Sequence, residues 1–151
     1  MTMSGFISIP FQFAGSEAMK LSIYQDHLLK RFGERFNQKF PDGNACLQFL
    51  ATKLQDERLI RIYEKVPVYA NVVLYLESEK MFLIMQMGTR TDPNEIKIST
   101  VLYRANEQAR IMIQDTDYPY VLPTDGKLRF GKERKYFELK KRESRYFSKM
   151  A

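Results

Sequence analysis

The sequence is poor in the residues that most often bind metals or cross-link small folds. It contains one cysteine, Cys46, and one histidine, His27. A lone cysteine cannot close an internal disulfide, and one Cys with one His is too few for a Cys/His metal site. We therefore expect no metal and no cofactor, and we expect a cytoplasmic location.

Long apolar runs are also missing. No stretch of about 18 apolar residues occurs, which argues against a transmembrane helix and predicts no membrane partner. The first residues lack the basic region that opens a secretory signal. A hydrophobic fraction of 44% and an aromatic fraction of 13% are enough for a packed core. The length suits one α+β domain over residues 1–151, with 127–151 as a basic C-terminal helix or arm.

Signatures of enzymes are scarce. The glycines are too scattered for a phosphate-binding loop, and no serine lies in the context of a nucleophile elbow. Glu95-Ile96-Lys97 has the E-x-K form found in one class of metal-dependent nucleases, but alternating charge on the solvent side of a strand gives the same pattern. Whether the protein is an enzyme stays undecided, with the balance against it.

Positive charge is concentrated near the end of the chain. Residues 127–149 contain ten Lys or Arg and three Glu, a net charge of +7. The rest of the chain contains fourteen basic and fifteen acidic residues, a net charge of −1. This asymmetry predicts a localised surface that faces a polyanion.

Aromatic residues are interleaved with the basic ones in this segment. Nucleic-acid-binding proteins use such mixtures because Lys and Arg neutralise phosphates while aromatic rings stack on unpaired bases. We therefore predict a small nucleic-acid-binding or nucleic-acid-associated accessory protein, with RNA or DNA as partner. An acidic protein partner, contacted by a protein-interaction module, is the second alternative, and a solvated helix face is the plainest explanation. The predicted contacts are Lys132, Arg134, Lys135, Lys140, Lys141, Arg142 and Arg145.

Hydrophobic periodicity predicts the order of the elements. An edge strand or extended arm is expected at 6–13, and amphipathic helices from Ser16 to about Lys39 and from Asn44 to about Glu57. Period-2 patterns predict strands at 58–64, 69–77, 80–87, 95–104 and 109–114, with a polar hairpin turn at 77–80. Residues 115–126 read as a loop or short edge strand, and 132–150 as a helix. The expected fold class is α+β: two N-terminal helices, an antiparallel sheet of about four to five strands, and a basic C-terminal helix.

This order of elements resembles that of the RelE/colicin-type ribonuclease toxins, in which paired N-terminal helices precede a small antiparallel sheet. The resemblance implies a metal-independent endoribonuclease as an alternative function. The general base and the groups that stabilise the phosphate would come from the fourth predicted strand, residues 95–104. The catalytic candidates on it would be Lys97, Tyr103 and Arg104, together with Thr100. Arg110 and Tyr136 would be secondary candidates.

The single His and the single Cys have simpler roles in this interpretation. We expect His27 to be a half-buried structural residue on a helix, and Cys46 to be a small buried hydrophobic residue.

Overall fold

The computed structural model describes residues 5–12, 18–89, 92–103 and 116–130. The described helices are α1 (Gln25–Phe36), α2 (Gly43–Leu54) and α3 (Ile60–Lys65), with a short 3₁₀ helix, η2 (Glu57–Leu59), before α3. The described strands are β1 (Phe6–Gln12), β2 (Ala18–Tyr24), β3 (Ala70–Leu76), β4 (Met81–Met87), β5 (Glu95–Tyr103), β6 (Pro119–Leu122) and β7 (Arg129–Phe130).

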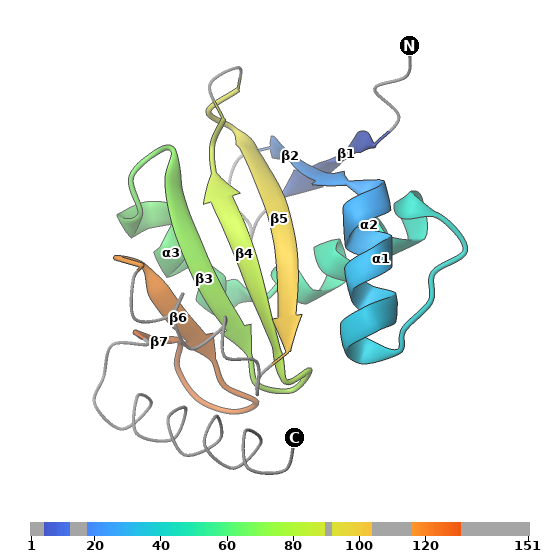
Figure 1. Ribbon diagram of the computed structural model, residues 1–151. Helices are drawn as coiled ribbons and strands as arrows, with labels where there is room; N and C mark the ends of the chain where they lie inside the picture. The colour runs from blue at the N-terminus through green and yellow to red at the C-terminus, as the bar shows by residue number, and fades with distance from the viewer. Residues whose placement is uncertain (1–4, 13–17, 90–91, 104–115, 131–151) are drawn as a thin grey trace.

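In this part of the chain the strands form one seven-stranded sheet in the order β1-β2-β5-β4-β3-β6-β7. The sheet is mixed: β2 runs parallel to β5 and β3 parallel to β6, while the other neighbouring pairs are antiparallel. Strands β3, β4 and β5 make its centre, and the β1–β2 hairpin extends it on one side (Figure 1).

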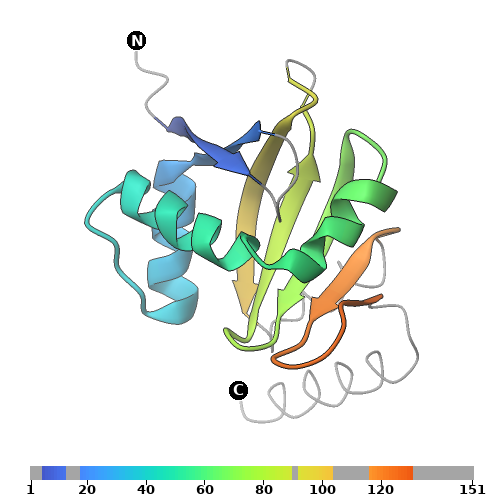
Figure 2. The same cartoon turned by 180° about the vertical axis from the view of Figure 1, so that it is seen from behind.

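The helices α2 and α3 cross one face of the sheet, as the view from behind shows (Figure 2). Helix α1 follows directly on β2 and lies beside the second half of β5, where β2 no longer pairs with that strand (Figure 1). There the Arg35 guanidinium donates to the Val101 carbonyl at 2.5 Å. The helix thereby covers backbone groups that an open strand edge would expose.

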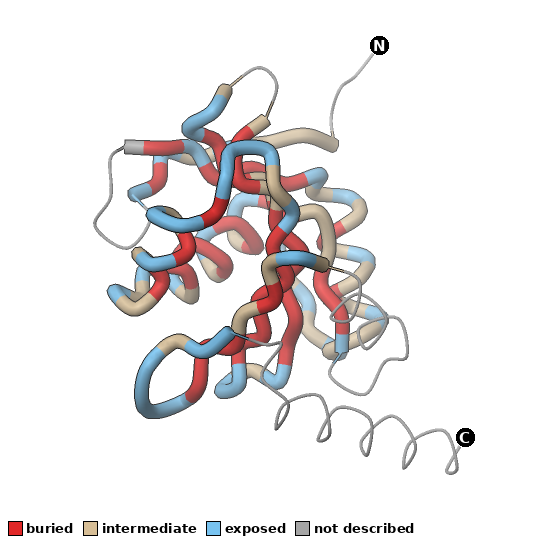
Figure 3. The backbone as a smooth tube through the Cα atoms, turned by 90° about the vertical axis from the view of Figure 1, so that its left-hand side faces the viewer, coloured by how far each residue is buried: buried red, intermediate tan, exposed pale blue. Residues whose placement is uncertain are grey.

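The main core lies between the helices and this sheet face. Leu28, Phe32, Leu47 and Leu50 of the helices are fully buried there with inward residues of the central strands such as Leu74. A smaller buried cluster lies on the other face, and its members are Val73, Tyr75, Phe82, Ile84, Leu102 and Val121. Buried positions accordingly run along the central strands, while exposed positions gather at turns (Figure 3).

The predicted helix from Ser16 to Lys39 is wrong over its first part. Residues 18–24 form strand β2, and the helix begins only at Gln25. Met19, Leu21 and Ile23 are buried while Lys20 and Tyr24 are exposed, so a period-2 pattern was present in the sequence. It was masked because Leu21, Tyr24 and Leu28 also fit helical spacing.

The predicted strand at 58–64 is also wrong, because η2 and α3 occupy this stretch. The Asp56 carboxylate accepts from the backbone N–H of Arg58 at 2.9 Å and so starts the helical turn. Leu59 and Ile62 are buried at a spacing of three, which suits a helix better than a strand.

The predicted fold class is therefore wrong in its arrangement. In the described residues the sheet dominates; it has seven strands rather than four or five and contains parallel pairs. Residues 115–126, predicted as a loop or a short edge strand, contain strand β6 at 119–122. It is not an edge strand, because β3 and β7 pair with it on either side. The predicted strand at 109–114 and the basic C-terminal helix at 132–150 lie outside the described residues.

Other predictions are confirmed. Strand β1 is an edge strand of the described sheet, and β3, β4 and β5 match three predicted strands. Helix α2 matches the predicted second helix, although its N-cap is Asp42 and it begins at Gly43 rather than at Asn44. The β3–β4 pair is a hairpin closed by residues 77–80. No helix in the described ranges is long and apolar enough to cross a membrane.

Candidate functional site

A row of polar residues crosses five neighbouring strands on the face turned away from α2 and α3. Strand register sets Ser22 opposite Lys97, and Lys97 opposite Gln86. The row extends to Ser8 on β1 and Asn71 on β3. Side chains at matched positions of neighbouring strands point to the same face. The sheet therefore gathers five hydrogen-bonding side chains that are far apart in sequence.

A pocket of about 380 Å³ opens beside this row. Its aromatic wall is the cross-strand pair Phe6 and Tyr24, whose ring centroids are 5.0 Å apart with the planes at 58°. Tyr24 is 45% exposed, so much of its ring remains accessible to a ligand. The polar wall includes Gln86, Thr89 and Glu95.

Glu95 is the buried carboxylate of the pocket, with 4% of its surface exposed. Its oxygens accept from the Ser22 hydroxyl at 2.6 Å and from the Thr89 hydroxyl at 2.9 Å. Gly88 directly follows β4 and has a φ of 89°, which glycine adopts easily. Its backbone N–H donates to the Glu95 carbonyl at 2.7 Å. This bond places the next residue, Thr89, beside the Glu95 carboxylate. Burial of a carboxylate is costly unless it is hydrogen-bonded, so the Ser22 and Thr89 hydroxyl groups stabilise the Glu95 carboxylate at the floor of the pocket.

Two lysines lie at the pocket. Lys20 forms an ion pair with Asp92 at 3.3 Å, and the Asn94 backbone N–H, together with Lys20, lowers the pKa of the Asp92 carboxyl. The Lys97 ammonium lies over the Tyr24 ring, 5.3 Å from its centroid. Within the described part of the chain no carboxylate reaches Lys97 at ion-pair distance. Lys97 is therefore the cation that remains available to an anionic ligand.

The structure does not bring the predicted catalytic residues Lys97 and Tyr103 together. The register of β4 against β5 shifts between Ile84 and Met85, so that Ser99 has no partner on β4. This bulge reverses the alternation of β5: Lys97 faces the pocket, while the Tyr103 ring packs against Phe36 of α1, 6.0 Å away. The third predicted residue, Arg104, lies outside the described residues, as do Arg110 and Tyr136.

Thr100 lies at the seam between α1 and β5, where the His27 Nε2 atom is 3.1 Å from the Thr100 Oγ1. Burial, and then the positive charges of Arg31, Arg35 and Lys30, lower the pKa of His27 below 6.5. The imidazole is half-buried, and Cys46 is fully buried with its thiol pKa raised by burial to about 12, so the predicted burial of both residues is confirmed.

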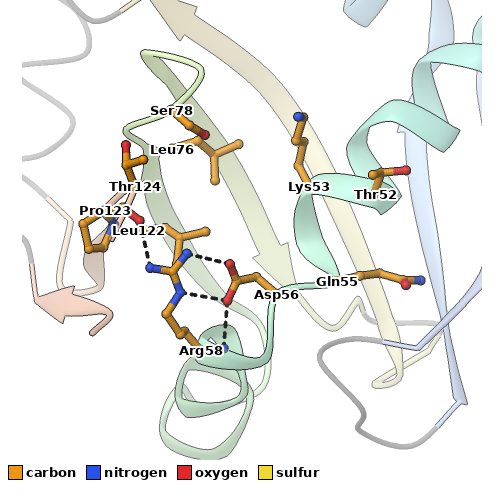
Figure 4. A pocket seen from close by; sticks show the side chains of 10 residues that line it. All are labelled: Thr52, Lys53, Gln55, Asp56, Arg58, Leu76, Ser78, Leu122, Pro123 and Thr124. Carbon is orange, nitrogen blue, oxygen red and sulfur yellow. Dashed lines mark hydrogen bonds and ion pairs between the residues drawn. The ribbon is translucent and has the colours of Figure 1, made fainter. Parts of the chain in front are cut away.

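A second pocket, of about 280 Å³, lies between the α2–α3 connection and the end of β6 (Figure 4). Its centre is Arg58, which bonds both oxygens of Asp56 and donates to the carbonyls of Pro123 and Gly126 at 2.8 and 2.7 Å. The side-chain hydrogen bond to Arg58 lowers the pKa of Asp56. The guanidinium thus ties the loop between β6 and β7 to the helices, which is a structural role.

The predicted nucleic-acid contacts, Lys132 to Arg145, all lie outside the described residues. The start of the basic segment is described: Lys127, Arg129 and Phe130 are exposed at the edge strand β7. No group of three or more His, Cys, Asp or Glu residues in the described ranges could hold a metal ion.

Sequence reasoning found only part of the pocket. It singled out Lys97, and Glu95 within the E-x-K pattern, and both line the pocket. It assigned Tyr24 to a helix, overlooked Gln86, and did not connect Glu95 with Ser22, 73 residues away. The alternation of residues 19–24 was the signal that could have placed Tyr24 on a strand.

The chain matches no family model, no curated protein and no solved structure.

Proposed function

We propose that the protein is a small nucleic-acid-binding accessory protein that contacts phosphates through its basic C-terminal segment, residues 127–149. The contacts are Lys132, Arg134, Lys135, Lys140, Lys141, Arg142 and Arg145. In this proposal the protein acts in the cytoplasm, as the single cysteine led us to expect.

The distribution of charge carries the proposal. The described residues contain thirteen Lys or Arg and twelve Asp or Glu, a net charge of +1. Residues 131–151 contain eight basic and three acidic residues, a net charge of +5. A nearly neutral domain with one strongly basic segment favours local contact with a polyanion over general attraction.

The described start of the segment, residues 127–130, adds support. The loop before β7 is fixed by the Arg58 hydrogen bonds to Pro123 and Gly126. Strand β7 then presents Arg129 and Phe130 outward. A cation and an aromatic ring at this edge continue the composition of the segment on a rigid base.

The ribonuclease alternative finds less support. It requires Lys97 and Tyr103 to act on one phosphate, yet the β5 bulge turns them to opposite faces of the sheet. The acidic-protein alternative depends on the same charges as our proposal, so binding experiments separate the two.

The test uses the full chain with labelled single-stranded RNA and duplex DNA at about 50 and 200 mM salt, which brackets physiological screening. EDTA is present, and binding and cleavage are read from the same gels. One variant replaces Lys140, Lys141, Arg142 and Arg145 by Gln. We expect weaker binding and a log affinity against log salt slope reduced by about 3 for single strands, from four lost phosphate contacts.

The matched control removes four charges elsewhere. Lys30, Lys39, Lys65 and Lys80 are exposed on the described domain. Replacing these four by Gln gives the same net charge, and we expect a nearly unchanged salt slope. Equal losses in both variants would show general attraction and contradict the proposal. No binding by the wild type would leave an acidic protein as partner, and cleavage in EDTA would revive the ribonuclease.

A further inference from the structure

We propose that the pocket between β1, β2, β5 and β4 binds a single unstacked nucleotide, with the base on Tyr24 and the phosphate on Lys97. The inference rests on the proposed function, since a strand held by the basic segment would supply that nucleotide. A free nucleoside monophosphate offers the same chemistry and is the other possible source.

The pocket has the size that such a ligand needs. Its volume of about 380 Å³ falls near the lower end of the range of about 300–1,000 Å³ typical of small-molecule sites. The lining is mixed, with an aromatic wall from Phe6 and Tyr24 and hydrogen-bonding groups opposite. A nucleotide combines an aromatic face, a polar edge and a negative charge, and so matches these walls.

The aromatic wall is accessible at low cost. Tyr24 lies on β2 with nearly half its surface exposed, and the neighbouring Phe6 ring fixes its tilt. The Lys97 ammonium over the ring is a partly exposed cation–π contact, which is weak and easily exchanged. A base can take the ammonium's place on the ring while the ammonium moves to the phosphate of the same nucleotide.

Lys97 is the lysine of the pocket that can bind the phosphate. Lys20 is already paired with Asp92, and the Glu95 carboxylate is held by two hydroxyl groups. Among the described lining residues this leaves one unpaired cation, which suits one phosphate rather than the several phosphates of a long backbone. The pocket is thus suited to one nucleotide, and affinity for a strand would come from elsewhere.

The polar row supplies groups for the edge of the base. The Gln86 amide offers a donor and an acceptor, and it is the register partner of Lys97 on β4. Thr89 and Glu95 add oxygen atoms at the floor of the pocket. Side chains of this kind read the edges of unpaired bases, which a duplex keeps inside its stack.

The test is an NMR titration of the full chain with uridine 5′-monophosphate, adenosine 5′-monophosphate, the matching nucleosides and inorganic phosphate. We expect amide shifts centred on Tyr24, Gln86 and Lys97 with the monophosphates. Nucleosides should bind more weakly at the same place, and phosphate alone should bind least. Shifts confined to other residues, or none at saturating nucleotide, would overturn the inference.

Variants separate the two contacts. Tyr24→Leu should weaken both nucleotide and nucleoside by about 5-fold to 150-fold, the range measured for base stacking on aromatic residues. Lys97→Gln should weaken the monophosphates but leave the nucleosides unchanged. Lys65→Gln removes an exposed lysine at the end of α3 and should change neither. A Lys97→Gln variant that weakens both classes equally would contradict the assigned role of the ammonium.

Two further experiments, one with a variant and one with an oligonucleotide, distinguish this inference from the proposed function. Mononucleotides do not need the basic segment, so the variant at Lys140, Lys141, Arg142 and Arg145 should bind them as the wild type does. A single-stranded oligonucleotide that shifts the same pocket residues identifies the strand as the source, whereas binding of mononucleotides alone identifies a free nucleotide. Strand binding with no shift at the pocket would sink the inference and leave the proposed function standing.

Discussion

The sheet face turned away from α2 and α3 has two halves that differ sharply. One half, on β3, β4, β6 and the end of β5, consists of the buried apolar cluster around Phe82 and Ile84. The other, on β1, β2, the start of β5, the end of β4 and the start of β3, consists of the polar row and the pocket at Tyr24. Gln86 lies two residues from Ile84 on the same strand, so the change occurs within one step of the pleat.

The boundary coincides with the bulge at Ser99 of β5. Before the bulge, Ile96 and Ile98 face the helices and Lys97 faces the pocket. After it, Val101 faces the helices and Leu102 joins the apolar cluster. One sheet face is therefore a packed core in one half and an open pocket in the other, because a single inserted residue changes the face to which the following side chains point.

Phe82 and Tyr24 test this difference most strongly, since each is an aromatic residue on the same face. Phe82 is 1% exposed and stacks near Tyr75 at 4.5 Å, so Phe82→Ala should cost about 3–5 kcal/mol of unfolding free energy. Tyr24→Ala, on the open half, should cost well under half of that. Urea unfolding followed by circular dichroism measures both. Similar losses would mean that the polar half is as structural as the apolar one.

Within the polar half, Ser22 on β2 and Ser8 on β1 are register partners that differ in burial. Ser22 is fully buried and donates to Glu95, whereas Ser8 is exposed. Ser22→Ala leaves a buried carboxylate oxygen without this donor and should cost about 1–3 kcal/mol. Ser8→Ala should change the unfolding free energy by less than about 0.5 kcal/mol. A small effect of Ser22→Ala would show that the pocket base does not depend on that bond.

Much of the central sheet could be predicted from the sequence. Strands β3, β4 and β5 and the hairpin turn carry strong local signals: dense apolar runs and a short polar link. Helix α2 follows a clear turn signal, Pro41-Asp42, and begins at Gly43. These elements are determined by residues near one another in sequence, which is why periodicity finds them.

The candidate site could not be predicted in the same way. It depends on β2 lying parallel to β5, which brings Lys20 beside Glu95 across 75 positions. It also depends on the bulge at Ser99. Strict alternation along β5 would place Lys97 and Tyr103 on the same face of the sheet, and the bulge places them on opposite faces. Long-range pairing and bulges are tertiary features, and no local pattern in one sequence encodes them.

The smallest effect is expected at the seam beside the bulge, where His27 contacts Thr100, the first β5 residue paired after Ser99. Burial and the neighbouring Arg31 and Arg35 hold the pKa of His27 below 6.5 in the folded protein. The unfolded chain then binds the proton more readily, so this contribution to stability is complete above pH 6.5 and is lost as the pH falls through the lowered folded pKa.

His27→Gln can keep a hydrogen bond to Thr100 but cannot titrate there. It should flatten the pH dependence of the unfolding free energy above about pH 5, where carboxylates are mostly ionised. Urea unfolding at several pH values, with an NMR titration of the single imidazole in the wild type, checks this. A folded pKa above 6.5, or a slope that His27→Gln leaves unchanged, would mean that the ring is solvated and that the seam leaves the second half of β5 open to water.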